Sequence, residues 1–136
     1  LRMEKGYRHW GHDISPDETP LEAGLAFCVA WDKPGGFIGR EAVMQQRERG
    51  VHQRLAKFRL VDPQPLLYHN EPVWRDGVIV GRTTSGMFGH TVGRSLGMAY
   101  VANAEGEATR EFVGADYYCK TAQDGVAVAK QILGVK

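Results

Sequence analysis

The sequence predicts an α+β fold, in which a helical and irregular first part precedes a small antiparallel β-barrel or sandwich and a helix closes the chain. Residues 39–50 are rich in strong helix formers and finish with basic residues and a glycine, which is typical of a helix end. Apolar and charged residues alternate over 56–60, as in a strand with one solvated face. Residues 72–80 hold Asp-Gly between two apolar runs, the pattern of a β-hairpin.

The first part of the chain is expected to consist of turns and short elements. Residues 1–6 have the character of a helix end closed by a glycine, as if the start of a domain were missing. Residues 15–18 and 19–22 each combine a hydroxyl cap, a proline at the first helical position and a glutamate at the third. We expect a capped turn at the first of these and a short helix at the second, leading into a strand near 25–31.

The second part is expected to be mostly β structure. Pro63 and Pro65 end the strand of 56–60, and residues 83–85 extend the second strand of the hairpin. The glycines at 86, 89, 93 and 97 are expected to serve turns and bulges before a further strand over 96–101. Apolar residues in 121–134 lie on one helical face and predict a short amphipathic helix, with a final strand over 126–128 as the alternative.

Composition narrows the class of protein. The 136 residues carry a formal net charge of +1, so no one-signed field favours nucleic acid or an anionic membrane, and neither is an expected partner. The apolar runs are too short to span a membrane, and no basic-then-apolar leader opens the chain, so we expect a soluble protein. Cys28 and Cys119 are expected to be buried thiols in a reducing compartment. This points to the cytoplasm.

Residues 7–13 hold the groups most able to carry chemistry. Two imidazoles and a carboxylate at 9–13 can bind zinc or run acid–base chemistry, but the spacing is not specific, and exposed or hydrogen-bonded histidines are the simpler interpretation. Tyr7, Arg8 and Trp10 can offer a stacking surface and a cationic fork to a flat, acidic ligand. The alternative is that Tyr7 and Trp10 pack in the core.

The residue patterns predict no catalytic residue. Ser85 lies in no Gly-x-Ser-x-Gly pattern, and Cys28 has no adjacent base. The glycines after residue 80 form neither a phosphate-binding loop nor a dinucleotide fingerprint. Composition and spacing therefore lead only to an α+β domain with a β-rich second half.

Three sets of residues together resemble the glycine-cleavage T-protein family, the folate-binding aminomethyltransferases. Residues 1–42 resemble the last part of the family's folate-binding domain, through the segments 1–14, 19–25 and 37–42. Residues 83–86 with 96–101 are similar to the core of its C-terminal barrel. Residues 7–11 and 65–69 look more like the relatives fused to sarcosine or dimethylglycine dehydrogenase, which are FAD proteins. Order and spacing agree over residues 1 to about 103.

The resemblance divides the chain into three parts. It implies a C-terminal remnant of the folate-binding domain over 1–50, a small antiparallel β-barrel over 51–103, and an atypical tail, a turn plus the amphipathic helix, over 104–136. The tail also looks like the last strand and helix of a corrinoid-binding Rossmann domain, which would make the chain a fusion of two truncated modules.

The resemblance implies a tetrahydrofolate-dependent module that handles one-carbon units from glycine, sarcosine or dimethylglycine. The family's catalytic carboxylate and the groups that hold the pterin would lie upstream of Leu1, so the isolated chain would lack the full active site. Four residues of this chain are expected to contact folate by resemblance: Arg2, Tyr7, Trp10 and Tyr117. FAD is implied only for the missing N-terminal part.

The second hypothesis from the resemblance is that the chain is a non-catalytic barrel module that docks an FAD-dependent N-methyl amine dehydrogenase. Its partner would be the dehydrogenase domain, or a second copy that covers apolar surface left by the missing half. A zinc protein is the third hypothesis. In a eukaryote the expected location would be the mitochondrial matrix.

Overall fold

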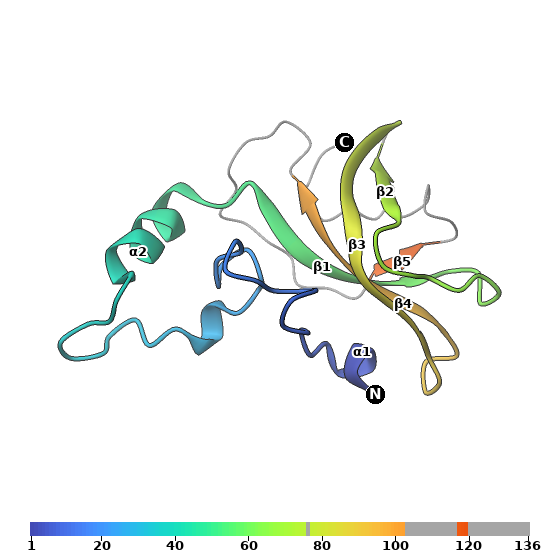
Figure 1. Cartoon of the computed structure of the whole chain (residues 1–136), viewed down its shortest axis with the longest axis horizontal. Coiled ribbons are helices and arrows are strands. Elements are labelled where there is room, and N and C mark those ends of the chain that lie inside the picture. Colours follow the sequence, from blue (N-terminus) through green and yellow to red (C-terminus); the bar gives the residue numbers. More distant parts are fainter. Residues whose placement is uncertain (76, 103–116, 120–136) are drawn as a thin grey trace.

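The computed structural model describes residues 1–75, 77–102 and 117–119. The expected helix over 121–134 lies outside them. Figure 1 shows an elongated molecule with the sheet at one end and α2 at the other. In chain order the elements are α1 (Arg2–Lys5), the 3-10 turn η1 (Ala26–Cys28), α2 (Arg40–Arg49), β1 (Gln53–Leu60), β2 (Pro72–Arg75), β3 (Val78–Gly89), β4 (Arg94–Ala102) and β5 (Tyr117–Cys119).

The strands form one sheet in the order β2-β3-β4-β1-β5. The pairs β2–β3, β3–β4 and β4–β1 are antiparallel, and β5 pairs with β1 in parallel. In the described residues β2 and β5 are the two edges, so the sheet is open rather than closed into a barrel. The predicted α+β class with an antiparallel sheet is confirmed. The described part of the expected tail is β5.

The elements with strong local signals form where they were predicted. The hairpin of β2 and β3 turns at Gly77, whose φ of 79° suits the left-handed conformation of a tight turn. The helix α2 ends at Gly50, and the short α1 closes at Gly6 with φ 73°. Among the described residues, none of the helices has the length and apolar character needed to cross a membrane.

Both faces of the sheet carry a hydrophobic cluster. Met3 of α1 packs against Leu55, Leu96 and Met98, while Leu60 and Leu67 pack with Phe58 on a second cluster. The predicted solvated face of β1 is therefore wrong in part, because α1 covers it. Lys57 lies on this face and donates from Nζ to the carbonyl of Glu4 at 2.8 Å.

The segment 25–31 is not the predicted strand. The amide of Cys28 donates to the carbonyl of Leu25 at 2.9 Å, and that of Val29 to Ala26 at 3.2 Å, so the backbone closes on itself as η1. Strand propensity depends on a neighbouring strand, and this segment has none among the described residues. The exposed side chain of Cys28 also makes the prediction of a buried thiol wrong.

The two capping boxes form as local hydrogen-bond networks. The Glu18 carboxylate accepts from the Ser15 amide at 2.7 Å, and the Glu22 carboxylate accepts from the Thr19 amide at 2.9 Å. The expected short helix after Thr19 is reduced to turns, which end at Gly24 with φ 67°. The carbonyl of Glu22 then accepts from the Leu55 amide at 2.8 Å, which ties this turn to β1.

Candidate functional site: a cavity between the N-terminal segment and the sheet

Asp13 is the centre of a group of hydrogen bonds that ties the N-terminal segment to the sheet, called the joint below. Its side chain is fully buried, and its Oδ2 accepts from Arg2 Nη1 at 2.6 Å and from the His9 amide at 2.8 Å. Its Oδ1 accepts from the Thr84 hydroxyl at 2.5 Å, and its carbonyl accepts from the Tyr100 hydroxyl at 2.9 Å. A buried carboxylate is stable only when its lone pairs are satisfied, and here each oxygen has a donor.

A tight turn in the sequence presents Asp13 to the sheet. Gly11 has a φ of 87°, and its amide donates to the carbonyl of Ile14 at 2.7 Å. The amide of Asp13 donates back to the carbonyl of His9 at 2.8 Å. The glycine permits the left-handed step that turns the carboxylate inward.

A β-bulge supplies the sheet side of the joint. The register of β3 shifts between Thr83 and Ser85 relative to β4, so Thr84 is the extra residue. In a regular strand, neighbouring side chains point to opposite faces. The bulge lets Thr84 reach Asp13 while the hydroxyl of Ser85 accepts from Arg2 Nη2 at 3.0 Å.

The environment keeps Asp13 ionised. Burial is the largest influence on its pKa and raises it, because a charge is disfavoured away from water. Hydrogen bonds outweigh burial and hold the pKa below its usual value of 3.8; they come from Thr84, the His9 amide, Ser85 and Arg2. Burial raises the pKa of the Tyr100 hydroxyl well above its usual range, so this group remains a proton donor.

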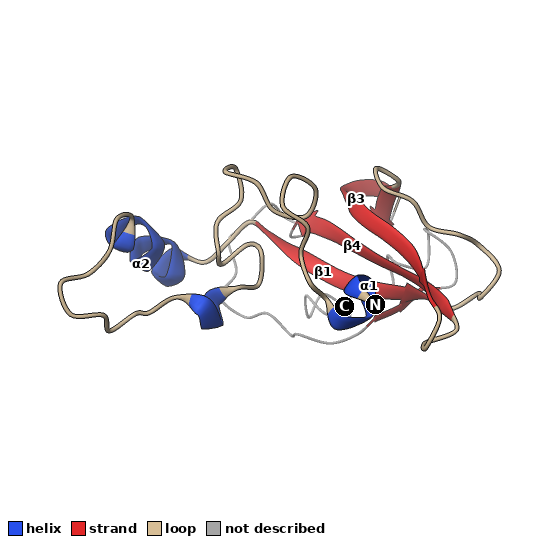
Figure 2. Cartoon of the chain, turned by 60° about the horizontal axis from the view of Figure 1, so that its bottom comes forward, coloured by secondary structure: helices blue, strands red, loops and turns tan. Residues whose placement is uncertain are grey.

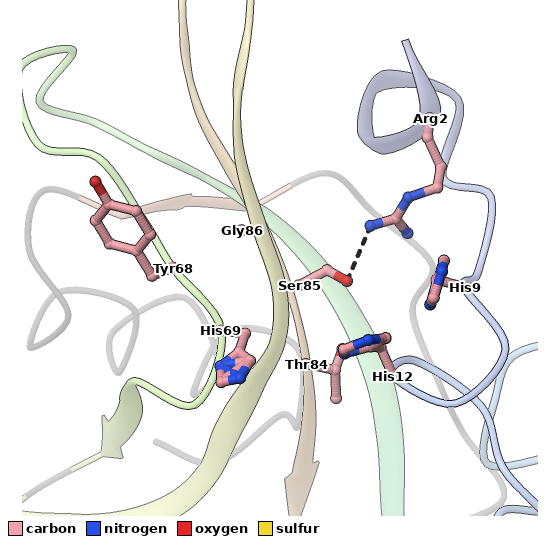
Figure 3. Close-up of a pocket in the computed structure, with 8 residues that line it drawn as sticks. All are labelled: Arg2, His9, His12, Tyr68, His69, Thr84, Ser85 and Gly86. Atoms are coloured by element: carbon pink, nitrogen blue, oxygen red, sulfur yellow. Dashed lines mark hydrogen bonds between the residues drawn. The ribbon is translucent and has the colours of Figure 1, made fainter.

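A cavity of about 470 Å³ opens beside this joint. Figure 3 shows its wall, with β3 between side chains of the N-terminal segment and of the loop that precedes β2. Its lining residues are Arg2, His9, His12, Tyr68, His69, Thr84, Ser85 and Gly86. The cavity therefore combines a guanidinium, imidazoles and hydroxyl groups from parts of the chain that are distant in sequence.

The imidazoles of the cavity lie near one another. The ring centroids of His9 and His12 are 4.7 Å apart, and those of His12 and His69 are 6.3 Å apart. His69 reaches this place because the preceding backbone lies against β3: a Cβ on Gly86 would be 2.2 Å from the carbonyl oxygen of Leu67. Only a glycine at 86 allows this close approach.

The predicted folate contacts lie in different places. Arg2 lines the cavity, whereas Tyr7 and Trp10 are each 66% exposed and are not among its lining residues. The alternative that Tyr7 and Trp10 pack in the core is therefore wrong. Tyr117 lies on β5, where its backbone is opposite Phe58 of β1. The folate contacts themselves stay a prediction.

The zinc hypothesis for residues 9–13 finds no matching geometry. Among the described residues, no group of three or more His, Cys, Asp or Glu side chains is arranged to hold a metal ion. Asp13, the carboxylate in the predicted set, is instead enclosed by Arg2 and Thr84. The residue patterns did not predict the hydrogen bonds around Asp13 or the place of His69. The run of hydroxyl residues at 83–85 before a glycine was the one available signal for a bulge.

Two protein-family models match the chain, and each covers residues that line the cavity. A family model described as the glycine cleavage T-protein C-terminal barrel domain matches residues 53–129, more than half of the chain. The chain belongs to the glycine cleavage T-protein family. A second model of this family, the GCVT N-terminal domain, matches residues 1–33. The cavity of this T-protein family member thus lies between its two matched regions.

Known relatives agree with this membership. A 4-methylaminobutanoate oxidase (formaldehyde-forming) of Paenarthrobacter nicotinovorans is 48% identical over 99 residues, which are 73% of this chain and 12% of the relative. Human mitochondrial sarcosine dehydrogenase is 42% identical over 106 residues, 78% of this chain and 11% of the relative. The chain therefore spans only about an eighth of these proteins.

A solved structure has a similar fold. The glycine cleavage system aminomethyltransferase T of Bartonella henselae superposes with a TM-score of 0.69 at 27% identity. The match covers 75% of this chain and 29% of that protein. The predicted resemblance to the T-protein family and to its dehydrogenase relatives is confirmed.

Proposed function

We propose that this chain is part of a tetrahydrofolate-dependent, aminomethyltransferase-like module that handles one-carbon units from glycine, sarcosine or dimethylglycine. Membership of the T-protein family supports this, as do a solved relative named an aminomethyltransferase and a curated relative named a sarcosine dehydrogenase. FAD would bind in another part of the protein. The location would be the cytoplasm, or the mitochondrial matrix in a eukaryote, as the name of the human relative suggests.

The observation that carries the proposal is the cavity at the junction of the two matched regions. Arg2, His9 and His12 come from the N-terminal match, and the rest of the lining comes from the barrel match. Its volume of about 470 Å³ is in the range of small-molecule sites. Hydrogen-bonding and cationic groups suit a ligand such as folate, which has a polar bicyclic ring at one end and carboxylates at the other.

The chain would supply one wall of the site. The Arg2 guanidinium is held by Asp13 and Ser85, so its position is set before a ligand arrives. The exposed rings of Tyr7 and Trp10 would stack on the flat part of the ligand, and Tyr117 would approach from β5. The groups that perform the transfer would lie in the rest of the protein.

A fluorescence titration tests the proposal. We would add tetrahydrofolate to the full chain and follow tryptophan emission, with free N-acetyltryptophanamide correcting for absorption by the ligand. We expect a saturable change that is largely lost in Trp10→Phe and retained in the matched variant Trp31→Phe. The absence of any saturable change up to millimolar ligand would reject a folate site on this chain.

A docking role is the second candidate, and exposed apolar side chains favour it. Phe27 is 82% exposed, and Ile38 is fully exposed at 103%. Large apolar groups on a surface mark contacts with other proteins when they gather in a patch. If tetrahydrofolate does not bind while the chain self-associates in sedimentation, and Ile38→Ser abolishes that association, the docking role is the better account.

A further inference from the structure

The charges around the cavity favour an anionic ligand. Among the described residues that line it there is a guanidinium, Arg2, and there are imidazoles and hydroxyls, but no carboxylate. Asp13 is close by, yet it is fully buried and paired with Arg2, so it does not face the opening. A lining of cationic and neutral donors without a carboxylate favours anions over cations.

The three imidazoles of the cavity are exposed and make no hydrogen bond with another described residue. The ring of His12 lies near two other imidazoles: its centroid is 4.7 Å from that of His9 and 6.3 Å from that of His69. Each imidazole therefore keeps a donor that a ligand can use.

Hydrogen bonds hold the backbone that carries the histidines on both sides of the cavity. His9 and His12 flank the turn that the buried Asp13 anchors. On the other side the amide of Tyr68, next to His69, donates to the Glu71 carboxylate at 2.8 Å, and the Thr83 hydroxyl donates to the carbonyl of Tyr68 at 2.7 Å.

We propose that His9, His12 and His69 bind the carboxylates of the glutamate part of the folate ligand. This inference rests on the proposed function and deepens it, because it assigns the glutamate end of the ligand to the histidines and the ring end to Tyr7 and Trp10. A glutamate carries two carboxylates separated by a short carbon chain, and a row of donors spaced a few ångströms apart matches such a pair. Charge-assisted hydrogen bonds to carboxylates are stronger than neutral ones, so even exposed imidazoles gain affinity. The ring end of the ligand would then point toward Tyr7 and Trp10.

The test compares whole and partial ligands on matched variants. Binding to the full chain would be measured by calorimetry for tetrahydrofolate, p-aminobenzoylglutamate, glutarate, and a reduced pterin without the glutamate part. The variants are His12→Gln and His69→Gln, and the control is His90→Gln, an exposed histidine on the β3–β4 turn that does not line the cavity. We expect each cavity variant to weaken tetrahydrofolate and p-aminobenzoylglutamate by about tenfold, as expected for loss of one charge-assisted bond. The reduced pterin should bind each variant as it binds the unmodified chain.

The outcomes separate the inference from the proposed function. Equal weakening of the reduced pterin would place the ring in the cavity and overturn the inference, while the folate site would stand. Unchanged affinity of every ligand in both variants would overturn it as well. Histidine-dependent binding of p-aminobenzoylglutamate or glutarate without binding of tetrahydrofolate would support a carboxylate site and reject the proposed function. If no ligand binds, both fail.

Nuclear magnetic resonance gives a second measurement that does not rely on substitution. Adding p-aminobenzoylglutamate should shift the imidazole resonances of His9, His12 and His69, while the resonances of His90 stay in place. A shift of His90 equal to those of the cavity histidines would indicate nonspecific binding and would contradict the inference.

Discussion

Residues 1–24 and 25–49 follow each other in the chain, but the first segment buries side chains that the second leaves exposed. The first segment buries Met3, Leu21 and Ala23, and its Asp13 is fully enclosed. The second leaves Phe27 82% exposed and Ile38 fully exposed, and Figures 1 and 2 show α2 extending away from the sheet. Only the first segment forms part of the cavity.

The difference shows that apolar content alone does not decide which segment docks. Residues 25–31 are all apolar, whereas residues 9–18 are mostly polar. The polar segment docks because the buried carboxylate of Asp13 has donors on the N-terminal segment and on the sheet. Arg8 adds bonds within the segment by donating to the carbonyl of Ala23 at 3.1 Å. A buried carboxylate without its hydrogen-bond donors is strongly destabilising. The bonds of Asp13 therefore favour one position of the first segment on the sheet.

The largest effect is expected from Asp13→Ala, which removes the docking group of the first segment. Arg2 and the Thr84 hydroxyl would lose their acceptor, and the free energy of unfolding should fall by about 3 kcal/mol. Urea denaturation measures it. The matched control is Asp32→Ala in the second segment, an exposed position where the change should stay within about 0.5 kcal/mol. Equal effects of the two variants would remove the contrast between the segments.

A smaller loss is expected from Gly86→Ala, which acts on the sheet side of the cavity. The new methyl group would overlap the backbone of Leu67, so the loop that carries His69 must move, at a cost of about 2 kcal/mol. Gly35→Ala in the second segment is the comparison: nothing lies within 4 Å, and only its φ of 78° is unfavourable, for about 1 kcal/mol. Thermal denaturation of both variants measures the two losses of stability. A Gly86 variant as stable as the Gly35 variant would contradict the close approach.

Acid should weaken the first segment through Asp13. Its pKa in the folded protein lies below the usual 3.8, so its ionised form contributes stability above that pH, and the contribution is lost as pH falls through the lower, folded value. The variant Asp13→Asn should therefore lose less stability than the unmodified chain between pH 5 and the acid limit of folding, a window that contains the value 3.8. Denaturant midpoints across this range measure the slope. Parallel slopes would mean that Asp13 titrates normally.

The smallest effect is expected from Ile38→Ser in the second segment. The side chain is fully exposed, so the free energy of unfolding should change by less than about 0.5 kcal/mol. Leu21→Ser, at a buried position of the first segment, should by contrast cost about 3 kcal/mol. Urea denaturation of the pair gives both numbers. A large loss in Ile38→Ser would show that the second segment packs against the rest of the chain.

The sequence predicted elements whose signals are local. The helix α2, the hairpin of β2 and β3, and the alternation of β1 each depend on residues within a few positions of one another. The predicted strand at 25–31 failed because a strand needs a neighbour, and propensity says nothing about whether one is within reach. The solvated face assigned to β1 failed for a related reason, since α1 covers it.

The candidate site depended on contacts that sequence spacing cannot show. Asp13 meets a partner 71 positions away at Thr84, and Arg2 meets Ser85 across 83 positions. The family resemblance predicted that Arg2 contacts folate, but nothing in it placed His69 beside His12. These side chains meet only when the bulge in β3 and the turn at Gly11 pack against each other.

Residue-resolved hydrogen exchange tests most directly the claim that Asp13 docks the first segment. Gly11 and Cys28 make a matched pair, because each amide donates to a carbonyl three residues away, at 2.7 and 2.9 Å. We predict that the Gly11 amide exchanges on the order of a hundredfold more slowly than that of Cys28, and that Asp13→Ala removes the difference while Met98 in β4 stays protected. Equal exchange in the unmodified chain, or a difference that persists in Asp13→Ala, would contradict the account.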